Sequence, residues 1–471
     1  MGLLTAAAGR ADVPVFPVVG VGGREAADEL WLLPGVRVVD SPRAAVLLVI
    51  VGRLTRALLH PALVVHDQLP GPRATLWWPV SHHDDDEDLL AAFPDVITAR
   101  PGDAGPLREA FADLLTGQRP SDPPALPDID ANNWRGMGPY GHGGEGMMGG
   151  VPYGRPMAEQ VPDPDGLMLD QLPLHVGPLF PALPPGLVLH LGLQGDVIRG
   201  LAVGDNPYRS WPGDPAVGPL ATDPFLHALT SPTTVAALEI ARARHHLVWL
   251  ARTLRLHGLN ARGRRVLVLA RSLTPADRSA VEALARRIGR DRGLAAATSG
   301  VGIIDPAVID QARADGKPPG LTGGPVVRAS GLETDARTND PAYADLEFEP
   351  VVHAPGDARA RLRQRVAEAT QALALAERAG DRERAPGWPV EGPRGALVPG
   401  QALPSAALVA LVPELVDGME WGDAVATIAS LDLDLEEAAF TPARVHAGVP
   451  AGTGGPGGSG RHGHRDQAAT S

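Results

Sequence analysis

Side chains that could bind metal ions or move protons gather in a few short stretches of this sequence. One is His82-His83, which an acidic run ending at Asp88 follows directly. Imidazole and carboxylate groups are ligands of divalent transition metals, so this stretch could hold such an ion. An acidic run also marks a solvated loop before a helix, because carboxylates are favoured at helix N-termini. The pattern favours the loop and leaves a metal site at His82 and His83 as the alternative.

A second stretch is the glycine-rich segment 132–150, which carries His142, Glu145, Met147 and Met148. Imidazole and thioether groups are ligands that suit copper. So much glycine disfavours helices and strands, and methionine side chains adapt well to apolar surfaces. The composition favours a loop that docks on an apolar surface. A free tether and a metal site that uses His142 are the alternatives.

Charged side chains and histidines of the second half form a third group. Arg328, Asp335 and Arg337 are close enough in sequence to form ion pairs with one another. Buried ion pairs commonly fix geometry, so we favour a structural network over a polar site for a small ligand. His245 and His246 lie on a predicted helix, where hydrogen-bonded core histidines are favoured over histidines of an active site.

The 471 residues include no cysteine. Disulfides, thiolate zinc sites, cysteine nucleophiles and four-cysteine iron–sulfur clusters are therefore excluded. The sequence also lacks a G-x-S-x-G nucleophile motif, a phosphate-binding loop and a dinucleotide-binding fingerprint. The formal charge of −13 argues against nucleic-acid binding, which needs a basic face to displace counterions from phosphate.

Hydrophobic residues make up 44% of the chain and charged residues 21%, a balance that allows a packed core. The first residues do not form a signal-peptide pattern. The longest apolar run, 44–51, is far shorter than the roughly 20 residues that a membrane helix needs. We expect a soluble cytoplasmic protein that reaches a membrane only through partners.

Residues 11–117 are predicted to form a small parallel α/β domain, because continuous apolar strands alternate with short helices. A Gly- and Pro-rich linker over 118–165 and a disordered tail over 441–471 are also predicted. The remaining domain, 166–440, begins with a hairpin that turns at Gln194-Gly195. The predicted strands of the first domain are 36–39, 46–51, 62–65 and 74–78, with helices near 53–60 and 105–116. The predicted helices of the second domain are 235–258, 274–289, 357–379 and 421–430.

Three passages of the second half carry a family resemblance. They are Gly320 to Tyr343, Gly356 to Arg361, and Val390 to Gly395 together with 421–432. In this order they resemble the large subunit (the 49-kDa, or D, subunit) of respiratory complex I and of group-4 nickel–iron hydrogenases. Glu239 with His245 and His246 is a weaker similarity to the same family.

The first domain resembles the small subunit (20-kDa, or B) of the same complexes, through Gly35 to Val49, Gly52 to Thr55 and Gln68 to Arg73. The resemblance implies a fusion of the two subunits in one chain. It also implies the fold class: a flavodoxin-like α/β N-terminal domain and a mainly α large domain with a small β-subdomain (α+β).

The sequence departs from both families where they hold their cofactors. No cysteine stands near 20–23 or 79–81, where the small subunit binds its [4Fe–4S] cluster. The large subunit's H-P-x-x-H-G loop reads Phe180 to Gly186 here, without either histidine. We therefore expect no iron–sulfur cluster and no nickel–iron centre. Quinone is the only cofactor candidate, and its reduction by the family's usual residues is not expected.

The resemblance implies a cofactor-depleted peripheral-arm subunit of a membrane-bound, complex I-like assembly, with a structural or conformational coupling role. Its partners would be antiporter-like membrane subunits, and its place the cytoplasmic, inner face of the plasma membrane. One alternative is an oxidoreductase subunit that binds quinone or another small molecule in the cavity between the domains, near Phe180, Arg328, Asp335 and Arg337. Another alternative is a free cytoplasmic scaffold.

Overall fold

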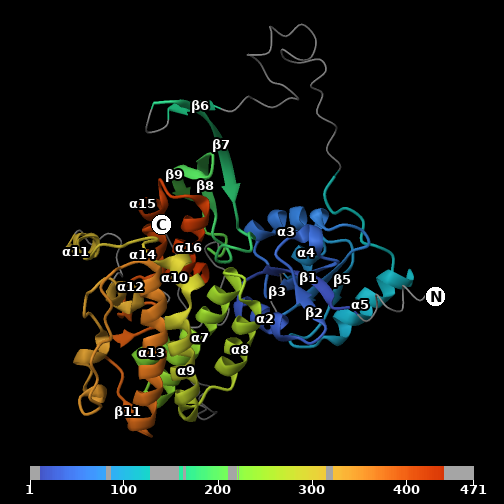
Figure 1. The fold of residues 1–471 in the computed structure, drawn as a ribbon. Helices are drawn as coiled ribbons and strands as arrows, with labels where there is room; N and C mark the ends of the chain where they lie inside the picture. The colour runs from blue at the N-terminus through green and yellow to red at the C-terminus, as the bar shows by residue number, and fades with distance from the viewer. Residues whose placement is uncertain are drawn as a thin grey trace, which may run out of the picture.

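The N-terminal part of the chain is a parallel α/β layer structure (Figure 1). The structure is a computed structural model that describes residues 11–80, 86–127, 159–162, 166–209, 220, 222–314 and 322–439. The strands are β1 (Val13–Val19), β2 (Val36–Val38), β3 (Leu47–Val51), β4 (Ala74–Trp78) and β5 (Val96–Thr98), in the order β2-β1-β3-β4-β5. The helices are α2 (Arg24–Leu32), η1 (Pro42–Ala44), α3 (Arg56–Gln68), α4 (Asp86–Leu90) and α5 (Gly105–Thr116).

Every strand pair of this sheet is parallel, as predicted. All residues of β3 and β4 are buried, because helices cover both faces of such a sheet and exclude water from its strands. The prediction of a strand at 62–65 is wrong, since these residues belong to α3. Thr55 caps that helix by accepting a hydrogen bond from the Leu58 N–H at 3.2 Å.

An antiparallel sheet follows, with the order β6-β7-β8-β9. Its strands are β6 (Glu159–Pro162), β7 (Met168–Val176), β8 (Leu189–Gln194) and β9 (Val197–Val203). The hairpin of β8 and β9 is present and turns at Gly195-Asp196, one residue beyond the predicted place. The predicted linker 118–165 needs correction at both ends. It contains β6, and its first residues pack on the α/β domain, where the Ala125 and Leu126 N–H groups donate to Asp67 at 2.8 Å each.

The rest of the chain is mainly helical, and two long helices pack side by side at its centre. These are α7 (Val235–Leu256) and α13 (Ala358–Ala379), both predicted from their apolar periodicity. The predicted helix at 274–289 is a short 3-10 turn, η4 (Pro275–Asp277), capped by Thr274 and followed by α9 (Arg278–Arg290). The predicted helix at 421–430 is α16 (Trp421–Leu431).

The other helical and strand elements complete this part. The helices are α6 (Asp223–Thr230), α8 (Asn260–Arg271), α10 (Arg292–Thr298), α11 (Pro306–Ala314), α12 (Gly324–Ala329), η5 (Ala336–Asn339), η6 (Pro341–Tyr343), α14 (Pro404–Ala410), α15 (Val412–Val416) and α17 (Leu435–Ala439). The strands are β10 (Thr233–Thr234), β11 (Glu383–Arg384), β12 (Val390–Glu391) and β13 (Ala396–Leu397). Among the described helices, none has the length and apolarity to cross a bilayer.

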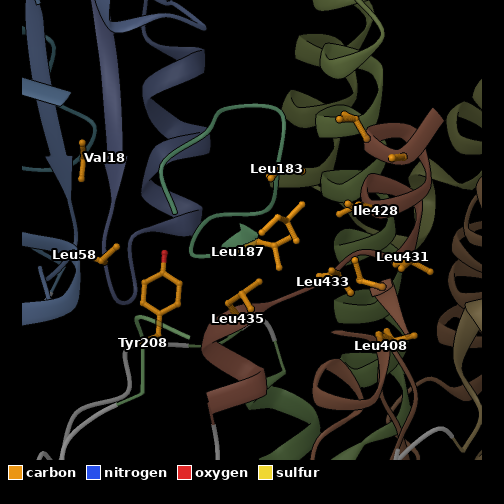
Figure 2. Close-up of a cluster of buried hydrophobic side chains, with 14 of the residues drawn as sticks. Val18, Leu58, Leu183, Leu187, Tyr208, Leu408, Ile428, Leu431, Leu433 and Leu435 are labelled. Carbon is orange, nitrogen blue, oxygen red and sulfur yellow. The ribbon is translucent and has the colours of Figure 1, made fainter. Parts of the chain in front are cut away.

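One hydrophobic cluster crosses from the α/β domain to the helical part. Figure 2 shows the ring of Tyr208 next to Leu58 on the α/β side, where Val18 also lies, with Leu187 and Leu435 on the way to the helical side. Hydrogen bonds support this crossing: the Tyr208 hydroxyl donates to the Val19 carbonyl at 2.9 Å. Shared burial of this kind holds the two parts together, because separating them would expose the cluster to water.

Candidate functional site

A cavity of about 500 Å³ lies between the α/β domain and the helical part. Its first wall comes from β1 and α2, and its second wall from the end of α7 and the residues around Asp432. The loop 178–185 covers a third side, and Figure 2 shows this loop between the two parts. Leu183 of the loop belongs to the shared hydrophobic cluster. A cavity of this size matches those that hold small ligands in proteins.

Glycines let the covering loop fold back on itself. Gly177 has φ +101°, and a Cβ there would lie 1.9 Å from the Leu187 carbonyl oxygen. Gly186 has φ +85°, and a Cβ would meet the Tyr208 ring at 2.2 Å. The Gly186 N–H donates to the Pro178 carbonyl at 2.9 Å, which closes the loop. Only glycine fits either position, since an L side chain would be strained and would clash.

Ion pairs between the two parts flank the cavity. Arg252 of α7 binds Asp28 of α2 at 2.6 Å, and Arg24 of α2 binds Asp434 at 3.1 Å. Asp434 lies two residues after Asp432, which also lines the cavity. The cavity therefore combines an apolar side with a charged side, and the charged side fixes α2 against the helical part.

Asp432 connects this cavity to a network of buried charges. Its carboxylate receives a 2.6 Å hydrogen bond from Nε2 of His245 and lies 3.4 Å from both Arg365 and Arg394. Burial alone would raise the pKa of Asp432, but Arg394 and then His245 and Arg365 hold it well below its usual value. Asp432 has φ +60°, so a left-handed residue turns this carboxylate back into the core.

Arg328 is the centre of a second, fully buried part of the network. Its guanidinium pairs with Glu368 at 2.8 Å, Glu391 at 2.6 Å and Asp335 at 2.9 Å. Burial opposes its charge, yet the three carboxylates raise the pKa of Arg328 above the usual arginine value. A guanidinium presents five N–H donors in a planar fork, which suits it to several carboxylates at once.

Arg337 extends the same network to α7. It binds Asp335 at 2.7 Å and Glu239 at 3.0 Å. The hydroxyl of Tyr343 donates to Glu239 at 2.7 Å, and Arg242 donates to Glu239 and to the Glu391 carbonyl. Nearly every charge in this part has an opposite charge beside it, which is the condition under which buried ions are tolerated.

Two neighbouring histidines join the Asp432 and Arg328 parts. His246 Nε2 lies 3.2 Å from Glu368, without the alignment of a hydrogen bond. Burial lowers the pKa of His245 to about 3 and that of His246 to about 4. Both rings are therefore neutral at physiological pH, and the Nε2–H of His245 donates to Asp432.

Glu436 is a buried carboxyl whose ionisation falls near neutral pH. Its carboxyl accepts a 2.8 Å hydrogen bond from the Gly22 N–H of the α/β domain. Burial and then the neighbouring Asp434 raise the pKa of Glu436 to about 8. This carboxyl is therefore protonated at pH 7 and can release a proton at the contact between the two parts.

Replacing Glu436 with glutamine is expected to stabilise the protein at alkaline pH. The folded-state pKa of Glu436 is raised, so the stability that its proton confers is present below about pH 4.5 and is lost as pH rises towards 8. The amide keeps the acceptor for Gly22 without the charge. The advantage of Glu436→Gln should grow by about 1.4 kcal/mol per pH unit over this window.

Urea unfolding at pH 5, 7 and 9 measures this difference. Glu414→Gln, at an exposed position of α15, is the matched control and should change nothing. An equal effect of Glu436→Gln at all three pH values would contradict the assignment of a raised pKa.

The structure separates the predicted site residues. Phe180 lines the cavity between the two parts and is 40% exposed there. Arg328, Asp335 and Arg337 do not line this cavity and are buried in the charge network. His82, His83 and His142 lie outside the described residues. Within the described part of the chain, no group of three histidine or acidic side chains is placed to hold a metal ion.

Sequence reasoning missed most partners of these residues. Glu368 lies on the charged face of α13, where it is buried together with Arg361 and Arg365. Arg24 and Glu436 belong to no motif that sequence reasoning recognises. The one available signal was the run Asp432, Asp434, Glu436 and Glu437 after an apolar helix. So many acids close together in a segment rich in leucine indicate buried counter-charges.

Comparison with known proteins gives one family match. Residues 276–399 match the family model described as respiratory-chain NADH dehydrogenase, 49 Kd subunit. This stretch contains Arg328, Asp335, Glu368 and Glu391. No curated protein matches the chain. Among solved structures, a chain from the membrane-bound sulfane sulfur reductase, an archaeal respiratory membrane complex, matches with 16% identity and a TM-score of 0.44, over 57% of this chain and 99% of that chain.

Proposed function

We propose that this protein is a peripheral-arm subunit of a membrane-bound complex related to complex I and to group-4 hydrogenases. Its role there is structural or conformational coupling, on the cytoplasmic face of the membrane and against antiporter-like membrane subunits. It fuses small-subunit-like and large-subunit-like parts and holds neither an iron–sulfur cluster nor nickel. The match of residues 276–399 to the 49 Kd subunit family carries this proposal.

Two further observations support it. The sequence contains no cysteine, so thiolate ligation of a cluster is excluded. The α/β domain and the helical part share a hydrophobic cluster and the ion pairs Arg252–Asp28 and Arg24–Asp434. Motion at one part would be transmitted to the other through these contacts, because packed interfaces shift between discrete arrangements rather than deform smoothly.

Purification of the tagged chain from its native membranes in mild detergent tests this proposal. We expect membrane subunits to copurify in fixed proportion, and alkaline carbonate to release the chain from membranes without detergent. Metal analysis should find far less than one iron or nickel per chain. Stoichiometric iron or nickel would refute the cofactor-free role. A chain found only in the soluble fraction, without membrane partners, would favour the free scaffold.

The cavity between the two parts favours a second candidate function, the binding of a quinone or another small molecule. Its aromatic walls, Phe180, Trp31 and Trp249, are suited to a flat apolar ring. Calorimetric titration with decylubiquinone tests this function. Ala27→Trp, which fills the cavity from α2, should weaken binding at least tenfold, and the exposed Ala57→Trp of α3 should not. Equal binding by the two variants would exclude this cavity.

A further inference from the structure

A groove of about 820 Å³ runs along the surface between α8 and α9, away from the cavity described above. Leu254 of α7, Val266 of α8 and Ile288 of α9 are buried at its floor. Leu269 and Leu284 are half-buried in its walls. The groove is therefore mainly apolar, although it is open to solvent.

The two ends of this groove differ in polarity. A short connection joins α8 to α9, and the ion pair Arg262–Asp291 places the start of α8 beside the end of α9. The two helices are thus antiparallel. Arg262 and Arg265 of α8 and Arg287 and Arg290 of α9 consequently gather at one end. The opposite end, near the connection, has leucine and alanine side chains.

The arginines at this end carry uncompensated positive charge. Asp291 is the acidic residue of the groove, and it is already engaged by Arg262 and by the Leu294 N–H, which it caps. Among the described residues, no carboxylate pairs with Arg265, Arg287 or Arg290. Arg359 donates to the Ile288 and Gly289 carbonyls and so covers the negative end of α9. This local excess is opposite in sign to the chain's net charge of −13.

We propose that this groove binds a free, single-chain amphiphile with an anionic head, such as a long-chain fatty acid. The carboxylate is bound by the Arg265, Arg287 and Arg290 guanidinium groups, which make charge-assisted, bidentate hydrogen bonds to such heads. The acyl chain lies along the apolar floor towards Leu269 and Ala283. The groove is charged at one end and apolar at the other, as a fatty acid is. Its volume is within the range of small-molecule sites. The site is independent of the function proposed above.

Calorimetric titration of the full chain with octanoate, decanoate and dodecanoate, each below its micellar concentration, tests this site. We expect one molecule bound per chain, with affinity rising about three- to tenfold for each two added methylenes. Full burial would give about fifteenfold, and the groove is open to solvent, so each methylene is only partly buried. Dodecyltrimethylammonium and dodecyl maltoside, which have the same tail with a cationic and a neutral head, should bind at least tenfold more weakly.

Paired variants locate the site. Arg287→Gln combined with Arg290→Gln should weaken dodecanoate binding at least tenfold. Arg286→Gln, whose exposed side chain is next in sequence but does not line the groove, should change it less than twofold. Ala283→Trp, which fills the apolar end, should weaken dodecanoate more than octanoate. Thermal unfolding checks that each variant is folded. If Ala283→Trp fails this check, Leu284→Asn replaces it as the variant of the apolar wall.

Several results would overturn the proposal. These are equal binding of the three head groups, more than one molecule per chain, no binding of dodecanoate, and no effect of the arginine variants. Vesicles that contain phosphatidylglycerol form a separate arm, in which we expect no binding. Vesicle binding that the same arginine variants abolish would assign the groove to membrane lipid and refute a free amphiphile as its ligand.

Discussion

Replacing Arg328 with methionine will lower the free energy of unfolding of the helical part by about 3–5 kcal/mol. Methionine keeps much of the side chain's volume and removes its charge. Glu368, Glu391 and Asp335 would then share a buried site without their common cation. Breaking a buried ion pair from one side is costly because the remaining charge has neither water nor a partner.

Guanidinium chloride unfolding, followed by circular dichroism, measures this loss. Arg278→Met is the matched control, because Arg278 pairs with Glu377 at 3.1 Å on the exposed surface of α9. An exposed pair contributes about 0–1 kcal/mol, so the control should barely shift the midpoint. Adding Glu391→Gln to Arg328→Met should restore part of the loss. A loss below 1 kcal/mol for Arg328→Met alone would show that the three carboxylates do not depend on this arginine.

The stability of the protein will fall as pH drops from 6.5 to 5, and His245 and His246 will account for much of the fall. Their folded-state pKa values, about 3 and about 4, lie below the unfolded value of 6.5. The unfolded chain therefore binds one more proton than the folded chain at pH 6.5, and nearly two more at pH 5. Each such proton contributes a slope of about 1.4 kcal/mol per pH unit. Glu436 acts in the opposite direction, because at these pH values the folded chain holds a proton there that the unfolded chain has mostly released.

The double variant His245→Gln with His246→Gln isolates the histidine contribution. Its slope of unfolding free energy against pH should be smaller than that of the parent by about 1.4 kcal/mol per pH unit at pH 6.5 and by about 2.7 kcal/mol per pH unit near pH 5. The measurement is the slope, so a general loss of stability in the variant does not affect it. His60→Gln, at an exposed position of α3, is the control. Equal slopes for the parent and the double variant would mean that neither ring is held neutral by burial.

Local sequence patterns predicted the long elements well. The spacing of apolar residues defined α7 and α13, and the continuous apolar runs defined β3 and β4. The strand β1 was not predicted, because Pro14 and Pro17 interrupt it and proline argues against a strand in the middle of a sheet. The run 62–65 was assigned to a strand because a short apolar run has no period that distinguishes strand from helix.

The candidate site was only partly predictable. Arg328, Asp335 and Arg337 are near one another in sequence, so their ion pairing could be expected. Their other partners, Glu368 and Glu391, come from elements 40 and 63 residues from Arg328. Only the packing of α12 against α13 and β12 brings these groups together. The walls of the cavity come from four separate stretches, so no local pattern marks it.

The contacts between the α/β domain and the helical part lie within one polypeptide. Their association is therefore unimolecular, and dilution cannot separate them as it separates two subunits. A covalent connection gives the two surfaces an effective concentration in the millimolar range when its length matches the distance it spans. An interface that would dissociate at cellular protein levels can thus stay formed, and loss of the proton from Glu436 can weaken it reversibly without loss of either half.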